Sequence, residues 1–445
     1  MFQKHVLENG LRVILVPKRN TQIITLLVLF GVGSRYEAPK LAGVSHFIEH
    51  MMFKGTKRRP TTLDISRELD TIGAEYNAFT AKDLTGYYIK SASKYLDLGL
   101  DILSDMLLNS KFEQQELERE KGVIIEEIRM YFDNPMFHIE DMIENLVFKG
   151  NTLGRSIAGD EKSVRGISRE AMLNFFSKYY HSKNAVIVAA GNVESNALKL
   201  IKDCFKNFRM VSDSWVPTTL KFKKFKPAQK TARLDFLAKK TEQLQLAIGF
   251  PAYSYSDKKL PALNLLSVIF GGTMSSRLFI EVRERRGLAY FIRTEIQPYQ
   301  DTGIFTIRAG LDPKRLEEAM QVISKEIYKI KKEGVTEGEL RRAKKTIEGR
   351  MALDLEDSSA LAGFYGKQEI LGEKVKTPEE KLEEIKRVTL EDVLKVAREI
   401  LQREKSSLAV IGPDKSGQIK SAFKSVFDPD SSGSKTDKQI FKFLL

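Results

Sequence analysis

Two histidines and a glutamate within five residues have the types and spacing of a catalytic metal site. His46 and His50 are four residues apart, so on a helix they would lie on the same face. Two imidazoles at this spacing can bind one zinc ion, and Glu49 could act as a general base beside an open coordination position. The order H-x-x-E-H is the reverse of the more common H-E-x-x-H motif. Because the chain has only five histidines, a chance match is rare, and the motif predicts one zinc ion per chain.

A catalytic zinc ion normally has three protein ligands, so this motif requires one more. The predicted helix over 113–132 offers six glutamates, which helical periodicity can sort against its apolar stripe of Leu117, Ile124, Ile128 and Tyr131. Glu118 and Glu126 point away from that stripe. Four others lie along its border: Glu113, Glu116, Glu120 and Glu127. Glu120 and Glu127 differ by about 20° around the helix axis, so one could bind the metal while the other orients a histidine or a water molecule. Periodicity leaves open which one does so.

Strands and helices around the motif must position these side chains. We predict strands over 11–17 and 21–30, followed by the histidine-bearing helix, which we expect to end at Gly55. An amphipathic helix over 61–72 precedes a hairpin formed by 74–81 and 85–90. The arrangement is typical of a mixed α+β domain.

The second half of the chain repeats the first at a displacement of 221 to 223 residues. The repeated landmarks are a helix start (Ser168 and Thr389), a strand end (Gly191 and Gly412) and a Glu-Leu pair (Glu116-Leu117 and Glu339-Leu340). We therefore predict two homologous tandem α+β domains, 1–210 and 233–428, each a mainly antiparallel sheet with helices packed on one face. A basic linker, 211–232, would join them, and a polar and then apolar tail, 429–445, would follow.

The second copy lacks the residues of the predicted metal site. The positions displaced by 223 from Glu120 and Glu127 are Ala343 and Arg350, and no histidine follows His181. We expect the second copy to be a degenerate, non-catalytic domain.

Composition narrows the other possibilities. The single cysteine, Cys204, excludes an internal disulfide framework and a multi-thiolate zinc site. We expect no membrane span and a cytoplasmic location, because no apolar segment is long enough and the N-terminus lacks a secretory signal. The net charge of +13 admits a nucleic-acid-binding protein, but the charge is dispersed along mixed helices and a basic run at 221–227. Because a series of stacking aromatic residues is also lacking, we expect no nucleic-acid partner.

Beyond these patterns, the chain resembles the pitrilysin/insulinase metallopeptidase family (inverzincins), in its processing-peptidase-like branch. The resemblance covers nearly all of residues 1–412 and rests on the segments His46–His50, Gly73–Thr80, Val123–Glu127 and Arg283–Tyr290. It implies that His46, His50 and Glu127 bind zinc. It also implies that Glu49 is the general base and Glu120 the carboxylate that supports the ligands.

The same resemblance implies two groups of substrate contacts. Asn77 and Ala78 would belong to a strand edge that binds the main chain of an extended peptide. Arg283 and Tyr290, in the non-catalytic half, would contact the substrate carbonyl or the oxyanion, as a cation and a hydroxyl can. In dimeric members of the family the second half of one subunit faces the zinc site of its partner. We therefore expect a homodimer in which Arg283 and Tyr290 could act in trans.

The predicted function is a zinc metalloendopeptidase that hydrolyses unstructured peptides or targeting presequences in an enclosed chamber. The alternative is a catalytically silent partner or structural subunit of a heterodimeric processing peptidase, paired with a degenerate paralogue. The complete set of zinc ligands in this chain favours the enzyme.

Overall fold

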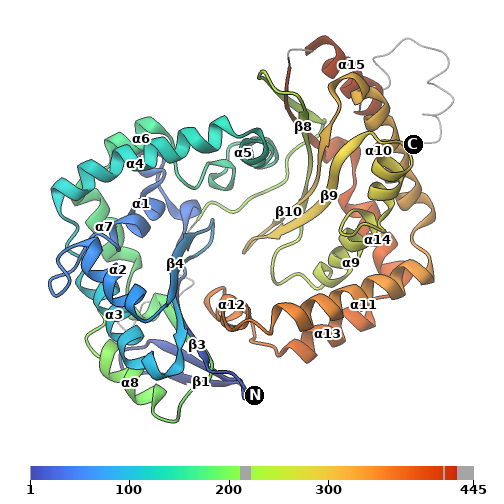
Figure 1. The fold of residues 1–445 in the computed structure, drawn as a ribbon. Helices are drawn as coiled ribbons and strands as arrows, with labels where there is room; N and C mark the ends of the chain where they lie inside the picture. The colour runs from blue at the N-terminus through green and yellow to red at the C-terminus, as the bar shows by residue number, and fades with distance from the viewer. Residues whose placement is uncertain (1, 211–221, 414–415, 428–445) are drawn as a thin grey trace. The chain divides into compact units, whose positions relative to one another are not determined.

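The computed structural model describes residues 2–210, 222–413 and 416–427, and it divides the chain into two compact units (Figure 1). Neither unit is a single continuous segment. The first consists of Met1–Met130, Arg155–Lys223 and Arg350–Glu380, and the second of Tyr131–Gly154, Lys224–Gly349 and Lys381–Leu445. The predicted tail, 429–445, and positions 211–221 of the predicted linker lie outside the described residues.

Six strands form the sheet of the first unit, in the order β1-β2-β6-β3-β5-β4. Their bounds are β1 Gln3–Val6, β2 Arg12–Pro17, β3 Ile23–Phe30, β4 Glu75–Thr80, β5 Thr85–Ala92 and β6 Ala185–Gly191. The pair of β2 and β6 is parallel, and the other neighbouring pairs are antiparallel. The central strands β3 and β6 are buried along almost their whole length, which suits their continuous apolar sequences. β4 lies at the edge of the sheet.

Helices cover one face of this sheet and build the larger core of the unit. These helices are α1 Val44–Met51, α2 Thr62–Thr71, α3 Leu96–Asn109, α4 Gln114–Asp133, α6 Glu161–Gly166, α7 Arg169–Tyr179 and α8 Ala197–Phe205. Alternation along β2 separates the two faces: Val13 and Leu15 pack among these helices, whereas Ile14 and Val16 belong to a second cluster. The strand pattern thus requires a cover on the other face as well.

A helix from the far end of the chain covers that other face. It is α12, Ser358–Ile370, and its apolar side chains pack against β2, β3 and β6. Gly366 allows a close approach, because a Cβ atom there would lie 2.8 Å from Leu29 Cδ1 and 3.0 Å from Val188 Cγ2. The partly exposed ammonium of Lys4, on β1, forms an ion pair of 2.7 Å with buried Glu369 of α12.

The sheet of the second unit has the order β7-β11-β8-β10-β9. Its strands are β7 Arg233–Ala238, β8 Leu244–Ala252, β9 Ala289–Pro298, β10 Gly303–Leu311 and β11 Ser407–Gly412. One face packs against helices of the second half: α9 Leu260–Phe270, α10 Leu316–Glu333, α11 Glu337–Asp354, α13 Pro378–Arg387, α14 Leu390–Ile400 and α15 Ser416–Phe427. The other face packs against α5, Pro135–Val147, which comes from the first half of the sequence.

The two sheets confirm the predicted fold class of two tandem α+β domains. The order β7-β11-β8-β10-β9 repeats β2-β6-β3-β5-β4. The helix that starts at Gln114 has its counterpart at Glu337, a displacement of 223 residues (337 minus 114). The compact units differ from the continuous segments 1–210 and 233–428, because α5 belongs with the second sheet and α12 with the first. Each sheet therefore carries a helix on the face for which the sequence predicted none.

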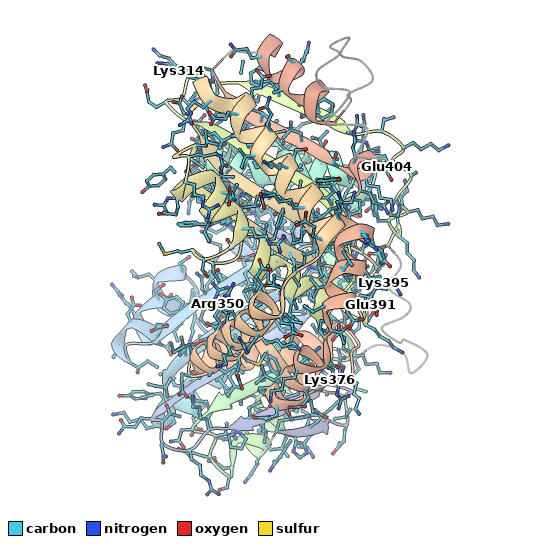
Figure 2. All side chains as sticks on the ribbon, turned by 90° about the vertical axis from the view of Figure 1, so that its right-hand side faces the viewer. Lys314, Arg350, Lys376, Glu391, Lys395 and Glu404 are labelled. Carbon is cyan, nitrogen blue, oxygen red and sulfur yellow. The ribbon has the colours of Figure 1, made fainter. Side chains whose placement is uncertain are left out.

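Charges of both signs alternate on the helices of the second unit. Figure 2 shows this for α14, where Glu391 and Lys395 are four residues apart and both are exposed. Residues four apart lie on the same face of a helix, so the opposite charges of such a pair attract each other. The exposed face of α14 therefore carries charges of both signs. Within the described ranges, no helix combines the length and the apolar character needed to cross a membrane.

Candidate metal centre and active site

Helix α1 carries His46, Glu49 and His50 along one side of its short length. The opposite side is completely buried in the core of the first unit, through Val44, Phe47, Ile48 and Met51. The two histidines and the glutamate are only half-buried. Because the apolar side fixes the rotation of the helix, these three side chains project away from the core.

Glu37 holds the N-terminal end of α1. Its two carboxylate oxygens accept hydrogen bonds from the backbone N–H groups of Gly43, at 2.7 Å, and Ser45, at 2.8 Å. Gly43 has a positive φ of 93°, and a Cβ atom there would lie 2.4 Å from the carbonyl oxygen of Ala158. Burial raises the pKa of Glu37 to about 7, against the two N–H groups that favour the ionised carboxylate.

Helix α1 is shorter than predicted, and a loop takes up the rest of the segment up to Gly55. The helix ends at Met51 and not at Gly55, because the chain turns away from the helix axis after Met52. Gly55 has a φ of 107°, and a Cβ atom there would lie 2.3 Å from the carbonyl oxygen of Pro60. Gly55 therefore serves the tight loop between α1 and α2 instead of ending the helix.

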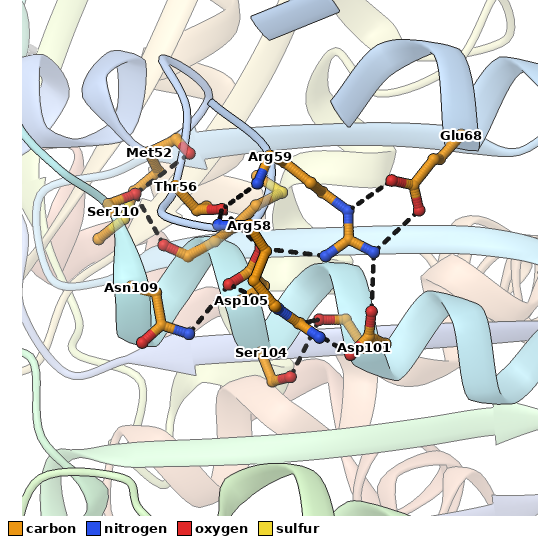
Figure 3. A network of polar contacts seen from close by, with 11 residues as sticks. Met52, Thr56, Arg58, Arg59, Glu68, Asp101, Ser104, Asp105, Asn109 and Ser110 are labelled. Carbon is orange, nitrogen blue, oxygen red and sulfur yellow. Dashed lines mark hydrogen bonds and ion pairs between the residues drawn. The ribbon is translucent and has the colours of Figure 1, made fainter. Parts of the chain in front are cut away.

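A network of polar contacts fastens this loop to α3 (Figure 3). Thr56 Oγ1 donates to Asp105 Oδ2 at 2.6 Å, and a guanidinium nitrogen of Arg59 donates to the same oxygen at 3.0 Å. Arg59 also contacts Asp101 and Glu68, at 2.7 and 2.8 Å. Because Asp105 and Arg59 are both buried, this network fixes the C-terminal end of α1 against α3.

The structure separates the glutamates of α4 by burial. Glu120 is 3% exposed and Glu127 is half-buried, whereas Glu118 and Glu126 are exposed, as is Glu113 just before the helix. Glu116 is also half-buried, but its carboxylate forms an ion pair of 2.5 Å with Arg119 of the same helix. Most of the predicted apolar stripe faces the core, but Tyr131 is 38% exposed, so its place in a buried stripe was wrong. The structure thus leaves Glu120 and Glu127 facing α1.

Three side-chain atoms of the first unit converge on one point. Nε2 of His46 and Nε2 of His50 lie 3.3 Å apart, and Oε2 of Glu127 lies 3.7 Å from the first and 3.4 Å from the second. Among the residues that the structure describes, these three form the one group of His, Cys, Asp or Glu side chains that could hold a metal ion.

The triangle has the size that zinc requires. Nitrogen and oxygen ligands about 2.0–2.1 Å from a tetrahedral zinc ion would be about 3.4 Å from one another. The measured separations of 3.3, 3.4 and 3.7 Å match this value. Two imidazoles and one carboxylate leave the fourth position free, as in a catalytic zinc site.

Glu120 lies behind His50. Its Oε1 atom is 2.9 Å from Nδ1 of His50, and its Oε2 atom is 2.6 Å from Nζ of Lys54. Burial opposes ionisation of Glu120, but the hydrogen bonds from His50 and Lys54 keep its pKa below the ordinary value. An ionised Glu120 accepts a hydrogen bond from the Nδ1–H group of His50, and this tautomer leaves the Nε2 lone pair for a metal.

Electrostatics favour a cation at the triangle. Burial and the nearby His50 lower the pKa of His46 to about 4. Burial alone would also lower the pKa of His50, but the carboxylates of Glu120 and Glu127 raise it to about 9. The two carboxylates thus favour positive charge next to the imidazoles, and a divalent cation at the triangle would supply it.

Glu49 lies beside the triangle and is held by a residue that the sequence analysis did not assign. Thr80 Oγ1 donates a hydrogen bond of 2.5 Å to Glu49 Oε2. Burial raises the pKa of Glu49 above its ordinary value, although this hydrogen bond acts in the opposite direction. Thr80 is the last residue of the segment Gly73–Thr80, which the sequence analysis singled out. Its contact with Glu49, 31 residues away, could not be predicted from the sequence.

Asn77 and Ala78 lie on the edge strand β4, as the resemblance implied for residues that bind a peptide main chain. Asn77 is exposed and Ala78 is buried, and they pair with Tyr88 and Tyr87 of β5. The Asn77 side chain accepts a hydrogen bond of 2.8 Å from the backbone N–H of Ala78. Their contact with a substrate stays a prediction.

Arg283 and Tyr290 belong to the second unit, where they are neighbours. The guanidinium carbon of Arg283 lies 4.7 Å from the ring centroid of Phe279 and 6.0 Å from that of Tyr290. Tyr290 is 72% exposed. Arg283 lies on a π-helix, Phe279–Glu284, which the sequence analysis did not predict and which is often found at functional sites. The role of this pair at a zinc site stays a prediction.

The second copy has no counterpart of the carboxylate pair. Buried Ala343 on α11 occupies the position equivalent to Glu120, and Leu340 is buried like its counterpart Leu117. The packing of the helix was thus retained while its polar group was lost.

Comparison with known proteins agrees with the two-unit fold. Residues 12–161 match the family model of insulinase, peptidase family M16, and residues 166–347 match that of the peptidase M16 inactive domain. The chain is 34% identical over 417 residues to an uncharacterized zinc protease of Streptomyces coelicolor, covering 94% of this chain and 90% of that protein. It is 33% identical over 413 residues to the uncharacterized zinc protease YmxG of Bacillus subtilis, covering 93% and 98%.

Solved structures show the same fold. A protease from Helicobacter pylori superimposes with a TM-score of 0.87 at 26% identity, covering 93% of this chain and all of that one. An M16-like peptidase from Alicyclobacillus acidocaldarius gives 0.82 at 20% identity, covering 93% and 98%. Fold and site together define a two-domain chain of the metallopeptidase type. The chain belongs to the insulinase family of peptidases, family M16.

Proposed function

We propose that this chain is a zinc metalloendopeptidase that hydrolyses extended, unstructured peptides, including targeting presequences. The observation that carries this proposal is the triangle of His46, His50 and Glu127, with sides of 3.3 to 3.7 Å. Glu49 lies close enough to interact electrostatically with His50 and Glu127. The complete set within one unit favours an enzyme over a silent partner subunit.

His46, His50 and Glu127 would hold the zinc ion. When bound, zinc supplies a Lewis acid that lowers the pKa of water and polarises a peptide carbonyl. Glu49 takes a proton from the attacking water and delivers it to the nitrogen of the leaving amine. Glu120 fixes the ring of His50 through Nδ1, and Lys54 keeps Glu120 ionised.

The substrate would add to the open edge of the first sheet. β4 is the edge strand, and a peptide that pairs with it gains main-chain hydrogen bonds that do not depend on sequence. This binding mode requires an extended peptide, and enclosure in a chamber would exclude folded proteins. Arg283 and Tyr290 would stabilise the negative charge that develops on the carbonyl oxygen.

Zinc content and peptide cleavage, measured on the same preparations, test this proposal. We expect one zinc ion per chain and cleavage of an unstructured fluorogenic peptide by the wild type. Glu49→Gln should keep its zinc and lose cleavage, while Glu126→Gln, which changes an exposed glutamate of α4, should behave like the wild type. A wild type that binds zinc but cleaves no unstructured peptide would instead support the silent-subunit alternative.

We also propose a homodimer in which Arg283 and Tyr290 act on the partner's zinc site. Mixing inactive Glu49→Gln chains with inactive Arg283→Ala chains distinguishes trans from cis action. Random pairing of a two-fold dimer would restore about a quarter of wild-type activity if the residues act in trans. No gain on mixing, with subunit exchange verified, would mean that both residues act within one chain or that the partner is a different protein.

A further inference from the structure

The hydrogen bond between Thr80 and Glu49 joins two elements with different tasks. Glu49 lies on α1, which carries the two histidines, and Thr80 is the last residue of the edge strand β4. The distance between Thr80 Oγ1 and Glu49 Oε2 is 2.5 Å. A hydrogen bond to a carboxylate is of the strong, charge-assisted kind.

We propose that Thr80 is the positioning residue for Glu49, and that it aligns this carboxylate with the strand that binds the peptide. The inference rests on the proposed peptidase function. Thr80 does not touch the reacting atoms, so it would act through Glu49.

The chemistry of a general base explains why one oxygen should be held. Glu49 must accept a proton from water and release it to an amine, and one carboxylate oxygen is sufficient for both steps. Among the described residues, Thr80 is the hydrogen-bond donor to Glu49, and it occupies Oε2. Oε1 remains for the proton, so the O–H bond of water breaks as the bond between Oε1 and hydrogen forms.

The backbone around Thr80 fixes the direction of its hydroxyl. Alternation along β4 places Thr80 on the same face as Ala78, which packs into the core that contains α1. The backbone is held by antiparallel pairing of Thr80 with Thr85. Threonine is also stiff at χ1, so the donor is ordered before a substrate arrives.

The side chain of Glu49 needs such a restraint. A glutamate has three rotatable side-chain bonds, and α1 fixes only the first atoms of the chain. A base that is displaced by about 1 Å can lose about 100-fold in rate. Fixing Glu49 to β4 sets its position relative to a peptide paired with the same strand.

The test compares Thr80→Val, which keeps the shape and removes the hydroxyl, with Thr80→Ser, which keeps the hydroxyl. The control is Thr62→Val, because Thr62 is exposed at the start of α2. For Thr80→Val we expect a kcat about 10- to 100-fold lower, with KM within about twofold and zinc still bound at one ion per chain. Thr80→Ser should recover most of the lost kcat, and Thr62→Val should match the wild type.

A second readout does not depend on activity. In crystals of zinc-loaded Thr80→Val, the Glu49 carboxylate should leave the position that it holds in the wild type, whereas in Thr80→Ser it should stay. Unchanged kcat in Thr80→Val, equal losses in both variants, or an unmoved carboxylate would overturn the proposal. If the wild type cleaves no peptide, the proposed function fails, and the crystallographic comparison still decides whether Thr80 positions Glu49.

Discussion

Nδ1 of His50 lies 2.9 Å from Oε1 of Glu120, and Nε2 of the same ring lies 3.4 Å from Glu127 Oε2. Glu120 thus fixes the ring from behind, while the other ring nitrogen faces Glu127, the carboxylate of the predicted metal triangle. Such an arrangement sets the tautomer of the histidine and increases its strength as a ligand.

Replacing Glu120 should therefore weaken zinc binding without abolishing it. We expect Glu120→Gln to lower zinc affinity by about 10- to 100-fold, because His50 loses a charged acceptor and Lys54 its ion-pair partner. Competition with a chromophoric chelator measures the affinity. Glu118→Gln, an exposed glutamate on the same helix, is the matched control, and an equal effect of both substitutions would contradict the assigned contact.

Substitutions of the neighbouring residues Glu126 and Glu127 on α4 should have opposite outcomes for the metal content of the protein. Glu127→Gln removes one of the three convergent atoms, so we expect the purified variant to lack zinc, whereas Glu126→Gln should retain one ion. Chelation should lower the thermal unfolding midpoint of the wild type and of Glu126→Gln, because a ligand bound to the folded state stabilises it. The midpoint of Glu127→Gln should not respond to the chelator.

The network in Figure 3 predicts a large stability effect away from the metal. Asp105→Ala would leave the buried guanidinium of Arg59 without one of its partners and Thr56 without its acceptor. Arg59 keeps Glu68 and Asp101 as partners, so we expect a loss of about 1–3 kcal/mol in the free energy of unfolding, measured with urea. Asp101→Ala removes a more exposed carboxylate and should cost about 1 kcal/mol or less. Equal costs for the two variants would be inconsistent with a buried network.

Glu37 predicts how stability depends on pH. Its carboxyl group titrates near 4.5 in the unfolded chain and, because of burial, near 7 in the folded protein. Between these values the folded state holds the extra proton, so this group's contribution to stability falls as pH rises from about 4.5 to about 7 and is constant above.

Glu37→Gln lacks this titration. The difference in unfolding free energy between the two proteins should move in favour of the variant by up to about 3 kcal/mol across this interval. Both chains contain the same histidines, so the difference between their urea-unfolding curves isolates Glu37. If the unfolding free energies of the wild type and the variant differ by the same amount at every pH from 4.5 to 7, Glu37 is ionised in the folded protein over this whole range.

Local patterns predicted the parts of the site that lie on one element. The spacing of His46 and His50 is a property of one helix, and periodicity placed Glu120 and Glu127 on the same side of another. Which carboxylate oxygen reaches the triangle depends on how α4 packs against α1, and no local pattern encodes that packing. The contact of Thr80 with Glu49 was hidden for the same reason.

The internal repeat predicted the tandem fold but not the exchange of helices between its halves. Thr25 Oγ1 on β3 lies 2.8 Å from Ser358 Oγ at the start of α12, although 333 residues separate the two in sequence. Both α5 and α12 were compatible with packing beside their own neighbours in the sequence. Each of the two helices instead packs on the apolar sheet face that no other described helix covers: α12 on the first sheet and α5 on the second.

The positions of α5 and α12 have a consequence for biosynthesis. One apolar face of the first sheet stays uncovered until the ribosome has synthesised and released α12, long after it has synthesised His46, His50 and Glu127. A chain cut at the linker would yield two fragments, each carrying a helix that the other needs. Neither half should therefore be recoverable alone in native form, whereas the two halves, produced together, should associate and complete each other's sheets.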